Sequence, residues 1–161
     1  MTRLPDAELA HTEQAFEFVA KAPMPIVAPL LGADRERLWA PDWAPEFLWP
    51  AVAHDRAGMV FSLAHGEKTA IWVNTAFDLQ SGRVQYVYVI PDTMVTVIAL
   101  RLAPQENGTH VAVTYQRTAL NAEAGDLVRQ MAAQDAAAGP EWEEQINGYL
   151  TEKNESPLYS D

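Results

Sequence analysis

The segment from Asn121 to Lys153 constrains the fold most, because it is the only stretch of this chain long enough to form one dominant helix. It carries two apolar stripes at helical spacing, and each stripe needs a hydrophobic surface to lie on. The stripes are Leu127, Val128, Met131 and Ala132, then Trp142, Ile146, Tyr149 and Leu150. We therefore expect a terminal helix that covers the rest of the fold.

The ends of this helix and its middle carry opposite signals. Asn121 is a good N-cap because its side-chain oxygen can accept a hydrogen bond from a free N–H of the first turn. Glu123 then lies at the positive end of the helix dipole. Gly139-Pro140 removes a backbone donor and costs about 3 kcal/mol inside an uninterrupted helix. We expect a kink or a break there.

The chain before Asn121 is predicted to form mostly strands. The first strand spans 13–20, with Phe16 and Phe18 on one face. Two short helices follow: one over 26–31 is ended by Gly32 at a C′ position, and one over 35–39 is capped by Asp34. The further predicted strands are 46–51, 58–64, 69–77, 83–90, 93–102 and 109–118.

The connections between these strands decide the fold class. Asn107-Gly108 is the strongest hairpin signal, and the other turns are nearly as short. Such turns leave little room for parallel crossovers, so the sequence predicts an α+β fold with an antiparallel sheet. The loop 38–50 carries three tryptophans and three prolines in thirteen residues, which predicts a structured loop.

Length and composition limit the classes of protein. The 161 residues predict a single domain over 13–153, with flexible termini at 1–12 and 154–161. No cysteine is present, which excludes disulfides, thiolate nucleophiles and Cys-ligated zinc. The N-terminus has no apolar signal region and no run approaches a membrane span, so we expect a cytoplasmic protein without membrane insertion. The net charge of −11 makes nucleic acid an unexpected partner.

Several runs, in order, resemble the START-related (SRPBCC) superfamily, which includes polyketide cyclases, dehydrases, lipid-transfer domains and the birch-pollen allergen. The likeness covers roughly 13–153. The runs are Trp39-Ala40-Pro41-Asp42-Trp43, with Asp42 where a glycine is common, Ile71-Trp72-Val73-Asn74-Thr75-Ala76-Phe77-Asp78, Arg83-Val84-Gln85-Tyr86, and the strand 109–120. The resemblance implies the helix-grip fold, with about seven curved strands around a long C-terminal helix and two short helices after strand one. It also implies a cavity, but does not choose among enzyme, carrier and regulator.

Side-chain alternation indicates which residues would line that cavity. Strands 83–90, 93–102 and 109–118 each have one clear apolar face, which we assign inward. For 69–77 alternation leaves the inward face open, and we favour Trp72 with Asn74 over the face of Ile71 and Phe77. The predicted ligand-binding residues are Trp39, Trp43, Phe61, Trp72, Asn74, Tyr86, Tyr88, Met94, Ile98, Tyr115, Met131 and Trp142. The alternative for each aromatic residue is plain core packing.

The sequence contains no catalytic or metal-binding motif. His54 and His65 lie in predicted turns, and His110 lies on the outward face of its strand, so none is a strong general base. There is no His-Glu-x-x-His cluster, Gly-rich phosphate loop or nucleophile elbow. We therefore expect no metal and no cofactor.

Three functions remain open. The first is binding of a small hydrophobic ligand, such as a lipid-, polyketide- or aromatic-like molecule. The second is a cyclase- or dehydrase-like enzyme, in which Tyr86 or Tyr88 donates a hydrogen bond and Asn74 holds an enolate oxygen. The third is a protein-interaction module whose cavity has collapsed and whose acidic surface meets a basic partner. A homodimer is also left open.

Overall fold

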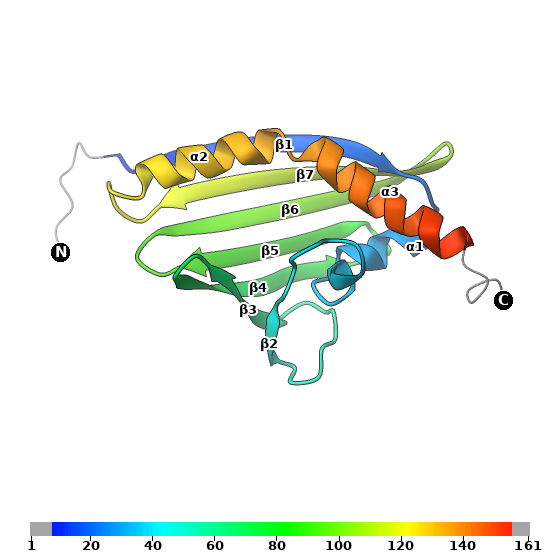
Figure 1. Ribbon diagram of the computed structural model, residues 1–161, viewed down its shortest axis with the longest axis horizontal. Coiled ribbons are helices and arrows are strands. Elements are labelled where there is room, and N and C mark those ends of the chain that lie inside the picture. The colour runs from blue at the N-terminus through cyan, green and yellow to red at the C-terminus, as the bar shows by residue number, and fades with distance from the viewer. Residues whose placement is uncertain (1–7, 156–161) are drawn as a thin grey trace.

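The computed structural model describes residues 8–155 and shows one antiparallel sheet with helices on one face (Figure 1). The strand order is β1-β7-β6-β5-β4-β3-β2. This confirms the predicted α+β fold and its antiparallel sheet. The strands are β1 His11–Ala20, β2 Glu46–Trp49, β3 Val60–His65, β4 Lys68–Asp78, β5 Arg83–Ile90, β6 Met94–Gln105 and β7 Gly108–Ala119.

The ends of the domain differ slightly from the prediction. The first strand begins at His11, so His11 and Thr12 belong to the sheet and not to a flexible terminus. The last helix runs to Glu155. Residues 8–10 of the predicted N-terminal segment are described and precede the first strand, whereas 1–7 and 156–161 lie outside the described residues.

The C-terminal segment forms two helices, α2 Gly125–Ala136 and α3 Gly139–Glu155, in agreement with the expected break. Pro140 has no N–H to continue the helical hydrogen bonds. Gly139 packs against Phe16, where a β-carbon would lie 3.3 Å from the ring. The predicted cap was wrong: Asn121 Oδ1 accepts from Ala124 N at 2.9 Å, one turn before α2 starts, and Ala124 occupies the cap position.

The two short helices lie where predicted, but their ends are made differently. The first comprises α1 Met24–Val27 and a 3₁₀ turn Ala28–Leu31, and the second is a 3₁₀ helix Arg35–Leu38. Gly32 is extended, with φ −74°, and not left-handed. A β-carbon there would meet the Asp55 carboxylate at 2.2 Å. That carboxylate, and not Asp34, accepts from the Asp34 and Arg35 N–H groups, at 2.8 and 3.2 Å.

A β-bulge in β4 explains why alternation left its inward face open. Asn74 lies opposite Tyr86, but Ala76 lies opposite Gln85, so one extra residue interrupts the register. Before the bulge Trp72 and Asn74 face the same way as the buried Tyr88 and Tyr86. After it Phe77 lies opposite Val84 and packs on the core. Each of the two alternatives was therefore correct for part of the strand.

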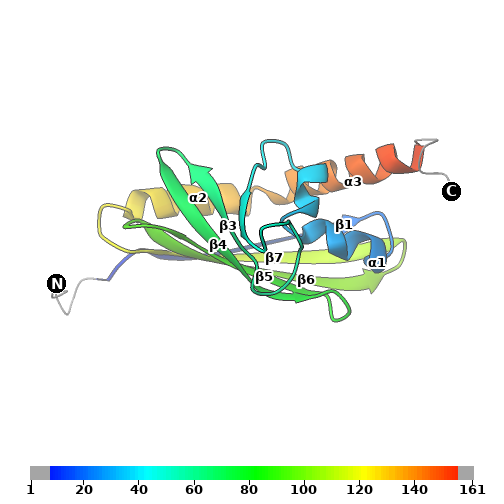
Figure 2. The same ribbon diagram turned by 90° about the horizontal axis from the view of Figure 1, so that it is seen from below.

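The helices cover only one side of the sheet and only part of that side. Helix α2 packs on β1 and β7, and α3 packs on β1 before it crosses towards α1 (Figure 1). Figure 2 shows that α2, α3, α1 and the segment before β2 all lie on the same side of the sheet. The middle strands β4, β5 and β6 are thus left to face this segment and α3 across the concave surface.

The register places the inward side chains of the middle strands in two neighbouring rows. The first row runs from Asn74 through Tyr86 and Ile98 to Tyr115. We call it the cavity row. The second, which we call the arginine row, runs Phe61, Trp72, Tyr88, Thr96, Arg117. These two rows contain most of the candidate functional side chains.

Candidate ligand site

A cavity of about 220 Å³ lies between the sheet, the 3₁₀ helix Arg35–Leu38 with the loop after it, and α3. Six aromatic side chains line it, together with smaller apolar residues, one carboxyl and one amide. The lining residues are Leu31, Glu36, Trp39, Ala40, Trp43, Trp72, Tyr86, Ile98, Leu100, Tyr115, Trp142 and Gln145.

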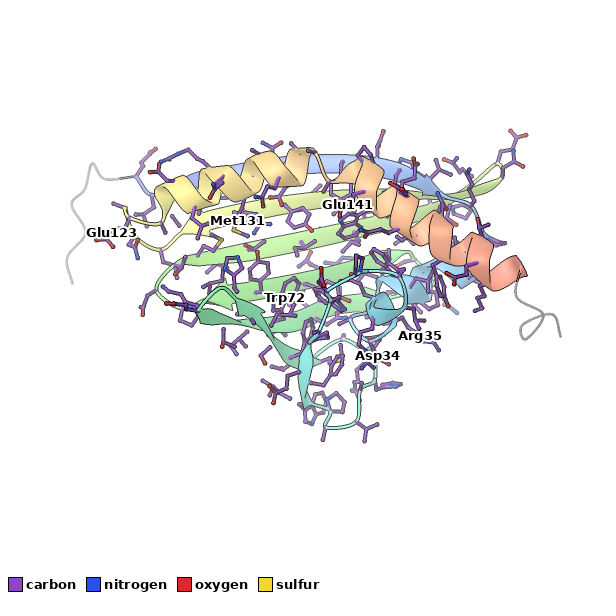
Figure 3. The ribbon with its side chains drawn as sticks, in the orientation of Figure 1. Asp34, Arg35, Trp72, Glu123, Met131 and Glu141 are labelled. Carbon is purple, nitrogen blue, oxygen red and sulfur yellow. The ribbon has the colours of Figure 1, made fainter. Side chains whose placement is uncertain are left out.

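The structure brings together seven of the twelve predicted ligand-binding residues. Those that line the cavity are Trp39, Trp43, Trp72, Tyr86, Ile98, Tyr115 and Trp142. Those outside its lining are Phe61, Asn74, Tyr88, Met94 and Met131. Figure 3 shows Trp72 and Met131 on opposite sides of the concave surface, on β4 and α2. Met131 therefore lies on the same side of the sheet as the cavity but does not line it.

The two tryptophans of the loop are fixed by the backbone that precedes them. Trp39 Nε1 donates to the Leu30 carbonyl at 2.7 Å, and Trp43 Nε1 donates to the Ala33 carbonyl at 2.8 Å. With both indole N–H groups satisfied, the rings can present apolar surface to the cavity. The prolines and tryptophans that predicted a structured loop thus build one wall of the site.

The hydroxyls of Tyr86 and Tyr88 both take part in hydrogen bonds with other groups of the chain. Tyr86 Oη donates to the Leu31 carbonyl at 2.7 Å, and burial raises the pKa of this phenol well above its usual value. Tyr88 Oη accepts from Arg117 outside the cavity. Asn74 is fully buried and also lies outside the lining. The Tyr86 hydroxyl is thus already bonded to the backbone and Asn74 lies outside the cavity, while their catalytic roles stay predictions.

Glu36 is the one carboxyl in the cavity wall among the described residues. No group in the described part of the chain hydrogen-bonds its side-chain oxygens, although the side chain is mostly shielded from solvent. Burial, and then the nearby Asp55 carboxylate, raises the pKa of Glu36 to about 8. A carboxyl of this kind exchanges its proton near neutral pH, and such groups are concentrated at functional sites.

Sequence reasoning missed Glu36 because Arg35-Glu36-Arg37 resembles an ordinary charged, solvated helix surface. One local signal was present. In a 3₁₀ helix, residues three apart lie on the same face, so Glu36 shares its face with Trp39. The other wall, Trp142 and Gln145 on α3, is more than a hundred residues away in the sequence. Only the tertiary structure encloses the carboxyl.

The histidines that the sequence analysis considered lie away from the cavity. His54 is exposed, His65 is at the β3–β4 turn, and His110 lies 3.2 Å from Glu17 on the outer face. None of them lines the cavity. Within residues 8–155 no group of three potential metal-ligating side chains comes together.

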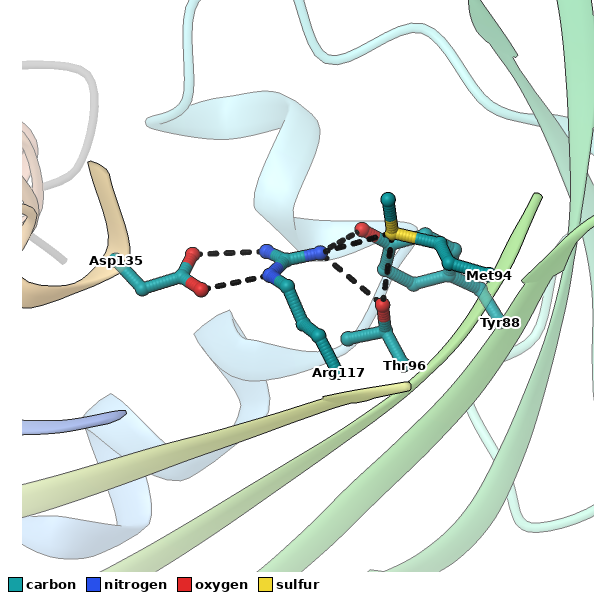
Figure 4. Close-up of polar contacts among 5 residues, drawn as sticks. All are labelled: Tyr88, Met94, Thr96, Arg117 and Asp135. Atoms are coloured by element: carbon teal, nitrogen blue, oxygen red, sulfur yellow. Dashed lines mark hydrogen bonds and ion pairs between the residues drawn. The ribbon is translucent and has the colours of Figure 1, made fainter. Parts of the chain in front are cut away.

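A second polar cluster lies beside the cavity and joins α2 to the sheet (Figure 4). Arg117 on β7 forms a two-pronged ion pair with Asp135 on α2, at 2.6 and 2.8 Å. The same guanidinium donates to Thr96 at 3.0 Å and to the Tyr88 hydroxyl. Burial alone would lower the pKa of Arg117, but the hydrogen bonds with Asp135 and Tyr88 outweigh it and raise the pKa above its usual value.

This cluster was also missed by the sequence analysis, although alternation pointed to it. Val111, Val113 and Tyr115 were assigned inward, and Arg117 is the next residue of that face. Its side chain is 5% exposed and that of Asp135 is 8% exposed. Because every charge here is paired, the cluster offers no free group to a ligand.

No family model matches the chain, and no curated protein matches it by sequence. Solved structures do match it by fold. Ara h 8.0201 is 15% identical with a TM-score of 0.64, covering 89% of this chain and 99% of its own. The protein MLL2253 from Mesorhizobium loti is 13% identical with a TM-score of 0.65, over 88% of this chain and 98% of its own.

Norcoclaurine synthase from Thalictrum flavum, in complex with dopamine and hydroxybenzaldehyde, is 11% identical with a TM-score of 0.61. The match covers 90% of this chain and 89% of the synthase. No helix among residues 8–155 combines the length and apolarity that crossing a membrane requires. The three structural matches show that this chain shares their fold, which agrees with the helix-grip fold that the sequence resemblance implies.

Proposed function

We propose that this protein binds a small, largely apolar molecule of one or two rings in the cavity between the sheet and α3. The observation that carries the proposal is a cavity lined by six aromatic side chains, of which Trp39, Trp43 and Tyr86 are held by hydrogen bonds to the backbone. A wall held in this way is already formed before the ligand arrives, as in most small-molecule sites.

The size of the cavity favours a small ligand over a lipid. Sites for drug-sized ligands span roughly 300–1,000 Å³, whereas this cavity holds about 220 Å³. The norcoclaurine synthase of the same fold is in complex with dopamine and hydroxybenzaldehyde, two one-ring molecules. A space of this size also argues against the interaction module, which requires a filled core.

The test uses 2-phenylethanol as a neutral one-ring probe, with binding followed by calorimetry. Ala40 lines the cavity, so Ala40→Leu fills part of it. Ala57 is exposed in the turn before β3, so Ala57→Leu adds the same atoms outside the site. We expect the natural protein and Ala57→Leu to bind the probe and Ala40→Leu to lose it. Equal binding by all three proteins would place the probe elsewhere and contradict the proposal.

A second candidate function is acid–base catalysis, and the raised pKa of Glu36 favours it. A carboxyl with a pKa of about 8 can give or take a proton at neutral pH, which a general acid or base requires. Native mass spectrometry of the freshly purified protein would identify a resident molecule by its excess mass. Turnover of that molecule by the natural protein and its absence in Glu36→Gln would support the enzyme. Unchanged turnover in the variant would exclude Glu36 as the catalyst.

A further inference from the structure

We propose that the ligand of this cavity is an organic cation, an aromatic or aliphatic ammonium ion whose charge lies between the aromatic walls and the Glu36 carboxylate. The inference rests on the proposed function, because it names the chemical class of molecule that the same cavity takes. Nothing in the overall fold requires a cationic ligand.

The charges of the lining point to a cation. The described residues around the cavity include one carboxyl, Glu36, and no lysine, arginine or histidine. A ligand carboxylate or phosphate would therefore meet a negative group and no positive one. An ammonium ion would supply the partner that the Glu36 side chain lacks within the described part of the chain. A half-buried carboxylate without a partner is poorly solvated, and a cationic ligand would supply the missing partner.

The aromatic walls fit the same class of ligand. Trp39 and Trp142 form one pair, with ring centroids 5.6 Å apart. Trp43 packs edge-on against Trp72 at 5.5 Å, and Trp72 lies 6.0 Å from Tyr86. Tryptophan and tyrosine faces attract cations through their quadrupoles, and groups of such rings recognise quaternary ammonium ligands. A cavity for a neutral ligand has no need of a carboxyl among these rings.

The surface next to the cavity is acidic as well. A groove between the 3₁₀ helix and α3 shares Trp39 and Gln145 with the cavity wall. Three carboxylates line this groove, those of Glu141, Glu144 and Glu152, and no cationic residue does so among the described residues. Glu141 also accepts from Gln145 Nε2 at 3.0 Å. Together with the net charge of −11, this groove would concentrate cations at the cavity.

The groups around Glu36 determine how binding depends on pH. Burial and then the Asp55 carboxylate raise the pKa of Glu36, while the phenols of Tyr86 and Tyr115, whose own pKa values are raised by burial, stay neutral. Arg35 and Arg37 of its own helix are exposed to solvent, and α3 contributes the neutral Trp142 and Gln145. In the empty site Glu36 binds a proton below a pH of about 8. A cation must displace that proton, so its affinity should fall as the pH falls below 8.

The experiment measures binding of three one-ring probes by calorimetry between pH 6 and 9. Trimethyl(2-phenylethyl)ammonium has a permanent charge, so any pH dependence belongs to the protein. 2-Phenylethanol is the neutral probe and phenylacetate the anionic one. The proteins are the natural chain, Glu36→Gln, and the control Glu67→Gln, which makes the same charge change on the exposed β3–β4 turn. A thermal scan of each variant checks that it is folded.

We expect the cation to bind the natural protein and Glu67→Gln at least about tenfold more tightly than the alcohol at pH 9. Its affinity should fall by up to about tenfold per pH unit below 8. In Glu36→Gln both the preference and the pH dependence should disappear, while binding of 2-phenylethanol is kept. This last result keeps the test informative, because it shows that the variant still has its cavity.

Two other outcomes overturn the inference, and they differ in what they say of the proposed function. If 2-phenylethanol binds at least as well as the cation, and Glu36→Gln changes neither, the cavity binds neutral ligands and only the inference fails. If none of the three probes binds the natural protein at millimolar concentration, both the inference and the proposed function fail. Tighter binding of phenylacetate than of the cation would also overturn the inference.

Discussion

Two neighbouring parts of the concave surface differ in whether their ionisable groups have partners within the chain. In the arginine row, Arg117 is buried with Asp135, Tyr88 and Thr96, and every ionic group has its partner. In the cavity row, two residues further along each strand, Tyr86, Ile98 and Tyr115 border a cavity in which Glu36 has no partner among the described residues. The first part is built as structure, and the second is left open to a ligand.

The physical difference lies in where the partner of each charge comes from. A buried ion pair is tolerated only when its geometry is good and its remaining polar atoms are satisfied, which Arg117 and Asp135 achieve within the chain. Glu36 instead remains close to neutral by holding its proton. A buried charge that is paired within the chain thus supports stability, whereas a half-buried carboxyl without a partner is a candidate for ligand binding.

The largest effect is expected when the ion pair between Arg117 and Asp135 is broken. Arg117→Met leaves the Asp135 carboxylate buried without its partner and should lower the free energy of unfolding by about 3–5 kcal/mol. Denaturant unfolding followed by circular dichroism measures this loss. The matched control is the double variant Arg117→Met with Asp135→Leu, which removes both charges and should recover much of the stability. A loss below 1 kcal/mol in the single variant would show that the pair contributes little.

Removing the charge of Glu36, unpaired among the described residues, should instead raise the free energy of unfolding. The pKa of Glu36 rises from an ordinary value of 4.5 to about 8 in the folded protein, so the protonated form is the one that folding favours. The contribution to stability is complete below pH 4.5 and is lost as the pH rises through 8. Glu36→Gln avoids this loss and should raise the free energy of unfolding by about 1–3 kcal/mol at pH 9.

The measurement is the melting temperature of the natural protein and Glu36→Gln across pH 4 to 9. The difference between them should be near zero at pH 4 and should grow as the pH rises. Glu67→Gln, on an exposed turn, controls for the general effect of removing one negative charge. A variant that is less stable than the natural protein at pH 9 would mean that Glu36 already has a stabilising partner.

Asn74 tests whether a neutral polar group without a partner also lowers stability. It begins the cavity row, is fully buried, and neither side-chain atom has a hydrogen-bond partner among the described residues. Leucine has a similar shape and no polar atoms, so Asn74→Leu should raise the free energy of unfolding by about 1–2 kcal/mol. Denaturant unfolding measures this gain in stability. The control is Asn107→Leu, which makes the same replacement in the exposed turn between β6 and β7, where leucine is a poor turn residue. Destabilisation by Asn74→Leu would reveal a hydrogen-bonded water at this amide.

The smallest effect is expected at the junction between the two regions. Helix α2 carries Asp135 of the paired cluster, and α3 carries Trp142 of the cavity. Pro140→Ala restores an N–H, but Gly139 still packs on Phe16, so the break should persist. We expect a stability change below about 1 kcal/mol and no change in probe affinity. A change above 2 kcal/mol in stability would show that the proline itself holds the two helices apart.

Local patterns predicted the strands well and the polar sites poorly. Strand β5 has the bounds that alternation predicted, because its hydrophobic face and its tight turns are properties of neighbouring residues. The inward face of β4 was ambiguous because the bulge after Asn74 changes its phase. Tyr86 was expected in the site and lines it, but its hydroxyl is used by the Leu31 carbonyl, a partner fifty-five residues away.

The sequence by itself determined the α+β class, the antiparallel order of short-turn strands, the helix break at Gly139-Pro140 and the absence of thiol chemistry. Each depends on residue type and on spacing along a few turns of chain. Only the tertiary structure decided which charged groups are paired and which are not. Arg117 meets Asp135 because α2 packs on β7, and Glu36 is enclosed because α3 crosses in front of it. Burial and pKa depend on such distant neighbours, which no local pattern contains.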